Sequence, residues 1–384
     1  GRTPLGDKGL GRLSTQKLGS KLEMITGKED DEKYNHIAFN WDDFTEDIVL
    51  SDVTTEFGYI PKKNKVKGTK LIISNLKDTN AWEGKSADKF KGQLSQLIFP
   101  FKEKRKFNVF LNINGERVDL DEIGEGLRNQ AVSTFAFAFD GSILTLTGTV
   151  KAYKIFGGSP GAEDRENYEQ LISIDKGKNF FNFLIDKNSN KRSFLTDVNY
   201  SGLNGELYKF ERKFHLADLP SVSLINREEK IDEIAEETDS NLAIANPGPF
   251  WGEIDDFNLR EADSLDSAFD NFAQYKNIVK NQIGIRVFRD GFGIKPFGID
   301  GYDWLQLGHS QTSGSSYYGL RPKNTIGFIA LTAEENKDLK EKTDREGFVE
   351  TPYSKNFFLL MGKVIDEINE LLEKTRRGYN DYKR

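Results

Sequence analysis

The feature that most constrains this chain is a glycine-rich loop near its start, Gly6-Asp7-Lys8-Gly9-Leu10-Gly11-Arg12-Leu13. Glycines let the backbone approach a ligand closely and adopt positive φ angles. An amphipathic segment from Leu13 to Leu22 follows at once, and we interpret it as a helix. Because the N-terminus of a helix favours an anion, the pattern indicates a loop that cradles phosphate groups. A plain flexible turn is the simpler interpretation of a glycine loop taken alone.

The spacing of the glycines excludes two common nucleotide-binding loops. The Walker A pattern Gly-x-x-x-x-Gly-Lys-Ser/Thr occurs nowhere in the sequence, and Gly84-Lys85-Ser86 does not match it because position 79 holds Thr79. A dinucleotide-binding fingerprint is also excluded, because no strand precedes the loop and its glycines are spaced differently.

Composition narrows the class of protein. The 384 residues suit two domains better than one. A formal net charge of -7 argues against general polyanion binding, although local basic patches remain compatible with it. The absence of cysteine excludes disulfides, thiolate zinc sites and a cysteine nucleophile. The histidines, His36, His215 and His309, lie far apart and form no spaced metal motif.

Two further features concern location and completeness. No apolar run approaches ~18 residues, so we expect no membrane span and a cytoplasmic protein. The chain begins at Gly1, and its two methionines are Met24 and Met361. We therefore expect a fragment whose natural N-terminal part is missing; a removed signal peptide is the alternative explanation.

The first part of the sequence alternates strand-like and helix-like patterns. The expected elements are a strand at 21–26, a charged hairpin tip at 27–33, a partner strand at 34–41, a lysine-rich loop at 62–67, a buried strand starting at 71–73, a helix at 87–97, and a strand at 107–113 closed by a turn at Asn114-Gly115. This order predicts one half of an α/β layer that ends near residue 115.

The rest of the sequence mixes strands and helices. The expected elements are a hairpin at 133–153 around Asp140-Gly141, a charged loop at 157–167, strands at 179–185 and 205–214, an acidic helix or solvated spacer at 228–239, a rigid turn at 246–250, a helix at 264–280, strands at 283–289 and 325–331, and a polar loop at 343–348. A terminal helix carries apolar residues at helical spacing: Phe357, Leu360, Met361, Val364, Ile368 and Leu371. This stripe indicates core packing, with a dimer contact as the functional alternative.

Three stretches, in this order, resemble one family: Gly9-Leu10-Gly11-Arg12, then Lys21 to Tyr34 with its acidic tip, then Gly68-Thr69-Lys70-Leu71-Ile72-Ile73. They are similar to the second half of the Bergerat ATP-binding fold. This fold defines the GHKL superfamily, which includes DNA gyrase B, the ninety-kilodalton heat-shock chaperones, histidine kinases and MutL. The closest likeness is to the chaperones and to bacterial chaperone-like ATP-binding proteins.

The C-terminal part carries a second likeness to the same family. Residues 288–298, followed by Asp303-Trp304-Leu305, resemble the transducer domain of those bacterial proteins. Asp344-Arg345-Glu346-Gly347-Phe348 is similar to the Ser-Arg-Glu loop of the chaperone middle domain. The resemblance implies an α+β fold: the C-terminal half of a Bergerat α/β sandwich in residues 1–115, then a mixed α/β transducer domain in 116–353 with an insertion around 150–280, then the helix at 354–384.

The resemblance also implies a site for ATP with Mg²⁺. The glycine-rich loop would be the ATP lid, Thr69 would face the adenine, and Arg345 would reach the γ-phosphate as the catalytic cation. The implied binding residues are Gly6, Lys8, Gly9, Leu10, Gly11, Arg12, Leu13 and Thr69. From the residues alone, Thr69 fits an ordinary ladder position, Arg345 fits a surface ion pair with Asp344 or Glu346, and the cations of the loop fit a solvated surface.

Other lysines allow two interpretations. Lys295 fits a surface lysine, or a cation that reaches the nucleotide from the transducer. Two clusters could meet the phosphates of a nucleic acid, or could be solvated loops, the interpretation that the net acidity favours: residues 62–67 and Lys102 with Lys104, Arg105 and Lys106.

The sequence departs from the family in one respect that limits its chemistry. The catalytic glutamate, the magnesium-binding asparagine and the Asp-x-Gly-x-Gly adenine motif of the family do not occur in it. We therefore expect ATP hydrolysis from the intact protein and not from this chain, with the magnesium ligand upstream of Gly1. The expected function is an ATP-driven, chaperone-like clamp that works as a homodimer on a protein client. The alternatives are a DNA-associated GHKL ATPase in repair or phage defence, and a non-catalytic binding module.

Overall fold

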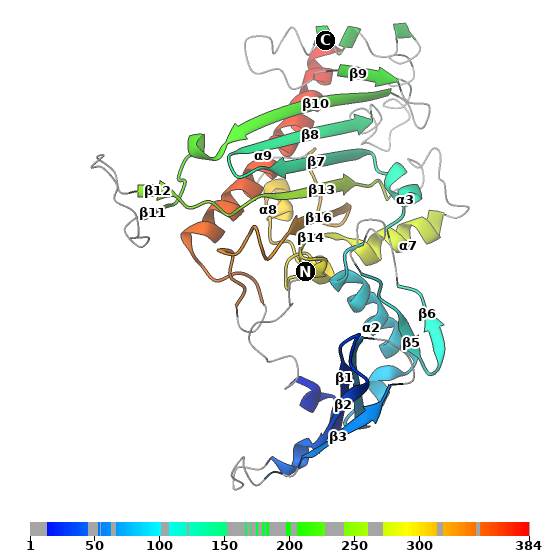
Figure 1. The fold of residues 1–384 in the computed structure, drawn as a ribbon. Coiled ribbons are helices and arrows are strands. Elements are labelled where there is room, and N and C mark those ends of the chain that lie inside the picture. Colours follow the sequence, from blue (N-terminus) through cyan, green and yellow to red (C-terminus); the bar gives the residue numbers. More distant parts are fainter. Residues whose placement is uncertain are drawn as a thin grey trace. The chain divides into compact units, whose positions relative to one another are not determined.

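The computed structural model describes residues 14–44, 53, 55–62, 67–100, 107–120, 123–151, 166, 170, 174–175, 179–180, 182–183, 197–200, 206–226, 242–259, 272–312, 318–342 and 346–383. The described residues form an α+β fold (Figure 1). The chain divides into two compact units, residues 1–90 and 91–384, whereas the sequence placed the end of the first domain near residue 115. Helix α2 (Gly84–Leu97) contains the boundary and agrees with the helix predicted at 87–97.

The first unit contains a four-stranded antiparallel sheet in the order β3-β2-β1-β4. Its strands are β1 (Gly19–Gly27), β2 (Lys33–Asn40), β3 (Glu56–Pro61) and β4 (Gly68–Leu76). The hairpin of β1 and β2 confirms the strands predicted at 21–26 and 34–41 and the charged tip between them. Short 3-10 turns lie at Ser14–Lys17, Trp41–Asp43 and Asn80–Trp82.

Two predictions for this unit were wrong. The helix predicted from Leu13 to Leu22 is, in its described part, one 3-10 turn followed by β1. Leu22 is buried within that strand because β1 pairs on both sides, and this pairing overrides the helical spacing of the apolar residues. Strand β4 begins at Gly68 and is exposed or half-buried, because it forms an edge of the sheet and is not a central strand.

The strand predicted at 107–113 is also shorter than expected. Only β5 (Leu111–Ile113) is a strand, and its partner is β6 (Glu116–Val118), in a separate two-stranded sheet. The turn at Asn114-Gly115 is confirmed, with φ angles of 53° and 86°. Because β5 pairs only with β6, it does not complete an α/β layer with the first four strands.

The second unit is built on an eight-stranded sheet in the order β15-β14-β16-β13-β7-β8-β10-β9. Its strands are β7 (Ser133–Phe139), β8 (Ile143–Lys151), β9 (Asp197–Tyr200), β10 (Glu206–His215), β13 (Phe250–Asp256), β14 (Gly284–Arg289), β15 (Phe292–Gly293) and β16 (Thr325–Leu331). The pair β14–β16 is parallel and the others are antiparallel. The predicted hairpin at 133–153 and the strands at 205–214, 283–289 and 325–331 are confirmed.

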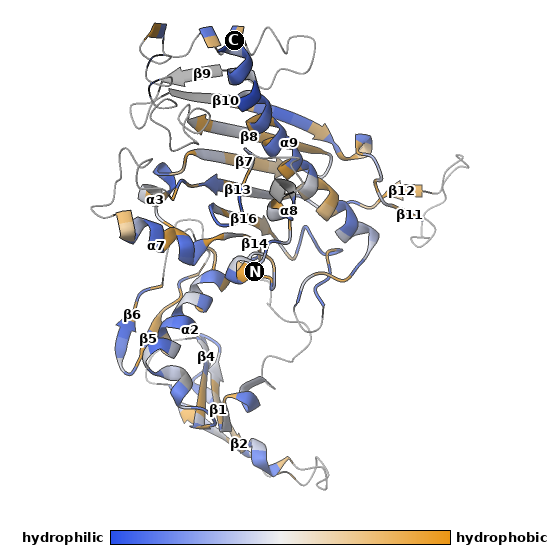
Figure 2. Ribbon diagram, turned by 180° about the vertical axis from the view of Figure 1, so that it is seen from behind, coloured by the Kyte–Doolittle hydropathy of each residue, from blue (hydrophilic) through white to orange (hydrophobic). Residues whose placement is uncertain are grey.

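Helix α9 (Pro352–Tyr382) runs across this sheet (Figure 1). All six residues of its predicted apolar stripe are fully buried, in one core cluster with residues such as Phe135, Ile254 and Val287 from the strands. The stripe therefore packs against the sheet. The ribbons of the sheet change between hydrophobic and hydrophilic residues along their length (Figure 2), as expected when neighbouring residues face opposite sides.

The other face of the sheet has its own core cluster. Helices α3 (Glu125–Asn129) and α7 (Phe272–Gln282) contribute Leu127 and Val279, which pack with Phe288 and Phe328 of the strands. The remaining described elements are α8 (Leu307–Thr312), β11 (Leu224–Asn226), β12 (Leu242–Ile244), and 3-10 turns at Leu216–Asp218 and Ile299–Gly301. The described part of the helix predicted at 264–280 is α7, which ends at Gln282.

The prediction of a strand at 179–185 was wrong. Its described residues are helical, and Phe180 is buried against Tyr379 and Tyr382 of α9, with ring centroids 5.5 and 5.4 Å apart. Phe183 also contacts Tyr382, at 5.4 Å. Residues three apart share one helical face, so both rings reach the same helix.

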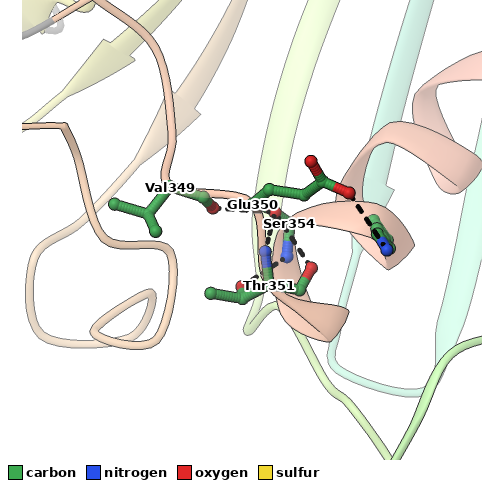
Figure 3. A network of polar contacts seen from close by, with 5 residues as sticks. Val349, Glu350, Thr351 and Ser354 are labelled. Carbon is green, nitrogen blue, oxygen red and sulfur yellow. Dashed lines mark hydrogen bonds and ion pairs between the residues drawn. The ribbon is translucent and has the colours of Figure 1, made fainter.

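Helix α9 begins at a capping box (Figure 3). The Ser354 amide donates to Thr351 Oγ1 at 3.2 Å, and the Thr351 amide donates to Ser354 Oγ at 2.9 Å. Each contact satisfies an amide that the helix itself leaves without a partner. The cap places the start of α9 directly after the chain segment 340–349, which forms part of the candidate site.

Candidate functional site

Most of the predicted site residues lie outside the described residues. These are Gly6, Lys8, Gly9, Leu10, Gly11, Arg12, Leu13 and Arg345, together with the acidic segment at 228–239 and, apart from residue 166, the charged loop at 157–167. Thr69 is described, and so are both flanks of Arg345. The site is therefore built from these described parts, one unit at a time.

Thr69 lies on the edge strand β4, directly opposite Thr26 of β1. The two hydroxyl oxygens are 2.7 Å apart, and Thr26 Oγ1 also lies within 3.4 Å of the Gly68 carbonyl, to which it donates. Thr69 is exposed. It thus occupies a surface ladder position, as its simpler interpretation held, and its hydroxyl keeps further capacity as donor or acceptor.

Thr69 shares a face of the sheet with an apolar row that crosses all four strands. The row consists of Phe57, Ile37, Met24 and Leu71, which are direct cross-strand neighbours. Since alternate residues of a strand face the same side, Leu71 and Thr69 point to one face. The exposed fraction is 60 % for Phe57 and 45 % for Leu71 at the ends of the row, whereas Met24 and Ile37 in its middle are half-buried, so the row is partly exposed.

The described lysines near the hairpin tip contact the protein itself. Lys67 Nζ lies 2.9 Å from Glu29 Oε2 and lowers the pKa of that exposed carboxyl group. Lys62 Nζ contacts the Lys28 carbonyl and lies 4.9 Å from the centre of the Tyr34 ring. Both described lysines of the 62–67 cluster are therefore engaged by the hairpin itself.

In the second unit, residues 340–342 pair with residues 346–349, and these two short strands are called the stem below; Arg345 lies between them in the sequence. The Val349 amide donates to the Lys340 carbonyl at 2.8 Å, and the Lys342 amide donates to the Gly347 carbonyl at 3.0 Å. Glu341 and Phe348 form an antiparallel bridge between these bonds. The left-handed φ of 91° at Gly347 is a conformation that glycine adopts without strain. The described flanks of the predicted polar loop are therefore joined by backbone hydrogen bonds.

The stem lies beside the other stretch that carries the transducer resemblance. Lys295 and Glu346 form a parallel bridge, and the rings of Phe297 and Phe348 are 5.3 Å apart. Lys295 is exposed, whereas Phe297 is buried. Two segments about fifty residues apart in the sequence thus meet, one residue from Arg345.

Buried aromatic packing holds the segment after β14 in place. The Ile294 amide donates to the Val287 carbonyl at 2.8 Å, and Trp304 Nε1 donates to the Ile285 carbonyl at 2.7 Å. The Trp304 ring lies 5.0 Å from Phe297 and stacks at 6.4 Å on Phe357 of α9. The stem is therefore positioned by the core of the second unit.

A buried charged cluster lies on the face that α3 and α7 cover, and sequence reasoning missed it. Arg128 Nη2 is 2.6 Å from Glu253 Oε2, and Arg128 Nε is 3.1 Å from Asp255 Oδ2. Burial raises the pKa of Asp255 to about 6, although Arg128 acts in the opposite direction. The only sequence signal was the pair of acids at the end of the apolar strand β13.

Among the described residues, no group of three or more His, Asp or Glu side chains is arranged to hold a metal ion. No helix in the described part of the chain is long and apolar enough to span a bilayer. Comparison with known proteins adds no family: no family model and no curated protein matches the chain. What the described arrangement offers chemically is a partly exposed apolar row beside two hydroxyl groups, and two backbone-paired strands that flank Arg345 in the sequence.

Proposed function

We propose that this chain is the C-terminal part of a GHKL-type ATPase that acts as an ATP-driven, chaperone-like clamp. The first unit would supply the back half of the nucleotide pocket, and the second would act as the transducer. The catalytic glutamate, the adenine-binding aspartate and the magnesium ligand would come from upstream of Gly1. The roles given below are those of groups that this chain itself supplies.

The observation that carries the proposal is the pairing of the stem with the segment after β14. The two stretches that resemble the transducer lie about fifty residues apart in the sequence. The Lys295–Glu346 bridge and the contact of Phe297 with Phe348 bring them together. Such a support suits a residue that must deliver charge to a fixed point, because preorganised donors stabilise a transition state without reorganising.

The first unit supports the pocket assignment in a second way. A purine needs an apolar surface for its faces and a few polar groups at its edge. The partly exposed apolar row and the neighbouring Thr69–Thr26 pair offer both on one side of the sheet. The glycine-rich loop immediately precedes this sheet in the sequence, where it would lie next to the phosphates of a bound nucleotide.

In this mechanism Arg345 stabilises the charge that gathers on the γ-phosphoryl oxygens during transfer to water. A guanidinium suits the task because its planar fork matches the geometry of phosphate. Lys8 and Arg12 would neutralise phosphate charge as the lid closes. Arrival of Arg345 would couple the nucleotide to movement of the transducer in a homodimer, and so to a protein client.

The test uses the natural protein with its upstream part. Titration with ATP and with ADP should show binding, and Arg345→Ala should lower turnover roughly a hundredfold or more while ADP affinity stays within about twofold. Lys342→Ala, which removes a neighbouring cation of the stem, serves as the matched control and should keep turnover near the wild-type value. Absence of nucleotide binding in the natural protein would refute the proposal, and unchanged turnover in Arg345→Ala would refute the role of Arg345.

DNA-associated work within the same superfamily is the less favoured role. Its support would be local basic patches, but Lys62 and Lys67 already contact the hairpin tip. If DNA were the partner, affinity would fall steeply with salt as phosphate contacts release counterions. A filter-binding series from about 50 to 200 mM salt separates the two roles.

A further inference from the structure

We propose that Arg289 is the positioning residue of the stem, because it holds the two strands that flank Arg345 in the sequence. That Arg289 holds the two strands of the stem follows from its own contacts and does not depend on the proposed function. Its consequence for turnover rests on the proposed function. Arg289 is the last residue of β14, and the sequence gives no sign of its link to residues 339–348.

One guanidinium contacts three separate points of the stem region. Arg289 Nη1 lies 2.9 Å from Glu341 Oε1, on the outgoing strand of the stem. Arg289 Nη2 donates to the carbonyl of Leu339, just before the stem. The Arg289 guanidinium carbon lies 5.7 Å from the centre of the Phe348 ring, on the returning strand. The side chain therefore joins both strands of the stem to β14.

The backbone of Arg289 is itself held on both sides. It pairs with Leu331 of β16 in the parallel register and with Phe292 of β15 in the antiparallel one. The next residue continues this support, because the Asp290 amide donates to the Leu331 carbonyl at 3.0 Å and Asp290 Oδ2 accepts from the Ala333 amide at 3.2 Å. The guanidinium thus projects from a position whose backbone is paired with a strand on each side.

The environment favours strong contacts over a screened surface pair. The side chain of Arg289 is only 16 % exposed and that of Glu341 only 28 %. Burial lowers the pKa of Arg289, while Glu341 acts in the opposite direction. An arginine starts so far above neutral pH that it stays charged. The attraction between the Arg289 guanidinium and the Glu341 carboxylate is therefore only weakly screened by water.

Lysine cannot replace arginine at this position. A guanidinium presents five donors in a planar fork and stacks on aromatic rings, whereas an ammonium is a single strongly hydrated point charge. Three simultaneous contacts, to a carboxylate, a carbonyl and a ring face, need the fork. Arg289→Lys therefore keeps the charge and removes the geometry, which separates positioning from simple electrostatics.

The first experiment needs only the 384-residue chain. Trypsin has three cleavage sites within residues 340–349, after Lys340, Lys342 and Arg345. We expect Arg289→Lys and Arg289→Met to raise the initial rate of cleavage at these sites at least tenfold, while the cleavage rate elsewhere changes much less. Lys337→Met, which changes an exposed cation outside the stem, is the control: it removes the cleavage site after residue 337 but should leave the cleavage rates after Lys340, Lys342 and Arg345 at the wild-type values. Equal cleavage rates in wild type and Arg289→Lys would overturn the proposal.

A second variant guards against global unfolding. Glu341→Gln removes the ion pair but leaves Arg289, its contact with Phe348 and its bond to Leu339 in place. We expect an intermediate cleavage rate and an unchanged melting temperature. If Arg289→Met fails to fold, Arg289→Lys and Glu341→Gln decide the question, and wild-type cleavage rates in both would overturn the proposal.

The final measurement is turnover in the natural protein. Arg289→Lys should lower kcat at least tenfold with KM for ATP within twofold of wild type, and adding it to Arg345→Ala should cause no further loss. A purely structural role would leave kcat unchanged in a folded variant, and that outcome would overturn positioning. If the wild-type protein shows no turnover at all, the proposed function fails, and the trypsin result alone decides whether Arg289 holds the stem.

Discussion

The guanidinium of Arg128 and the carboxylate of Asp255 meet at 3.1 Å, in a place where the Asp255 side chain is only 6 % exposed. This contact joins the short helix α3 to strand β13 of the large sheet. Asp255 nevertheless has a pKa raised to about 6, because burial disfavours its charge more than Arg128 favours it. At neutral pH both side chains are therefore charged, and burial of the Asp255 carboxylate opposes the stability that the ion pair provides.

The first prediction concerns pH. The folded protein binds a proton at Asp255 more tightly than the unfolded chain, whose carboxyl groups titrate near 3.9. Stability from this group is therefore fully present below about pH 4 and is lost as the pH rises through about 6. The loss amounts to about 3 kcal/mol. Asp255→Asn should remove this part of the pH dependence, as measured by urea unfolding between pH 4.5 and 7.

Asp88→Asn, which changes an exposed carboxylate, is the control for that series. The slope of its unfolding free energy against pH should match the wild type. A wild-type slope in Asp255→Asn as well would show that Asp255 does not carry the effect.

The second prediction concerns the partner cation. Arg128→Met should destabilise the protein by about 3–5 kcal/mol at pH 7, because it leaves Glu253 and Asp255 near each other without their cation. The pKa of Asp255 should rise further above 6. In a double-mutant cycle, Arg128→Met should cost less in the Asp255→Asn background. Strict additivity of the two free-energy changes would argue against an energetic link between these side chains.

Local sequence patterns correctly predicted the elements that bury one continuous set of apolar residues or that pair with an adjacent strand. The stripe on α9 repeats at helical spacing and packs on a single surface, so periodicity alone identified it. Strand β16 has the predicted bounds because apolar residues fill it and both neighbours pair with it. The β7–β8 hairpin follows from Asp140-Gly141 between alternating strands.

The wrong predictions concern residues whose structure depends on contacts with distant parts of the chain. The composition around Phe180 and Phe183 is typical of a strand. Both rings, however, pack against helix α9, and residues three apart can do so together only on a helical turn. Residues 107–110 read as a strand yet have no strand partner among the described residues. The contacts of Arg289 and Arg128 join segments far apart in the chain, so no local pattern could predict them. For the candidate site, sequence likeness selected the two segments, and only the fold revealed their contact.

The third prediction tests a buried polar hub at the start of α9. The fully buried Asn356 accepts from the Ser223 amide at 2.7 Å, and it donates to the carbonyls of Ser223 at 2.9 Å and of Ala245 at 2.7 Å. Asn356→Ala leaves these groups without partners and should cost about 3 kcal/mol. The midpoint of urea unfolding should fall at an unchanged m-value. Lys355→Ala, next in the sequence but exposed, should shift it by less than about 0.5 kcal/mol.

The last prediction separates two roles of Thr69. If its hydroxyl contacts the base of a bound nucleotide, Thr69→Val in the natural protein should weaken ADP binding about tenfold, the effect of one lost hydrogen bond of roughly 1.4 kcal/mol. Thr26→Val makes the same chemical change on the opposite strand and leaves the Thr69 hydroxyl in place, so its affinity should stay within about twofold. Both variants should keep the free energy of unfolding within about 1 kcal/mol, because a cross-strand hydroxyl pair at the surface contributes little. Calorimetric titration measures the affinities. Equal losses in the two variants would assign the effect to the Thr26–Thr69 pair itself, and no loss in either would remove Thr69 from the binding site.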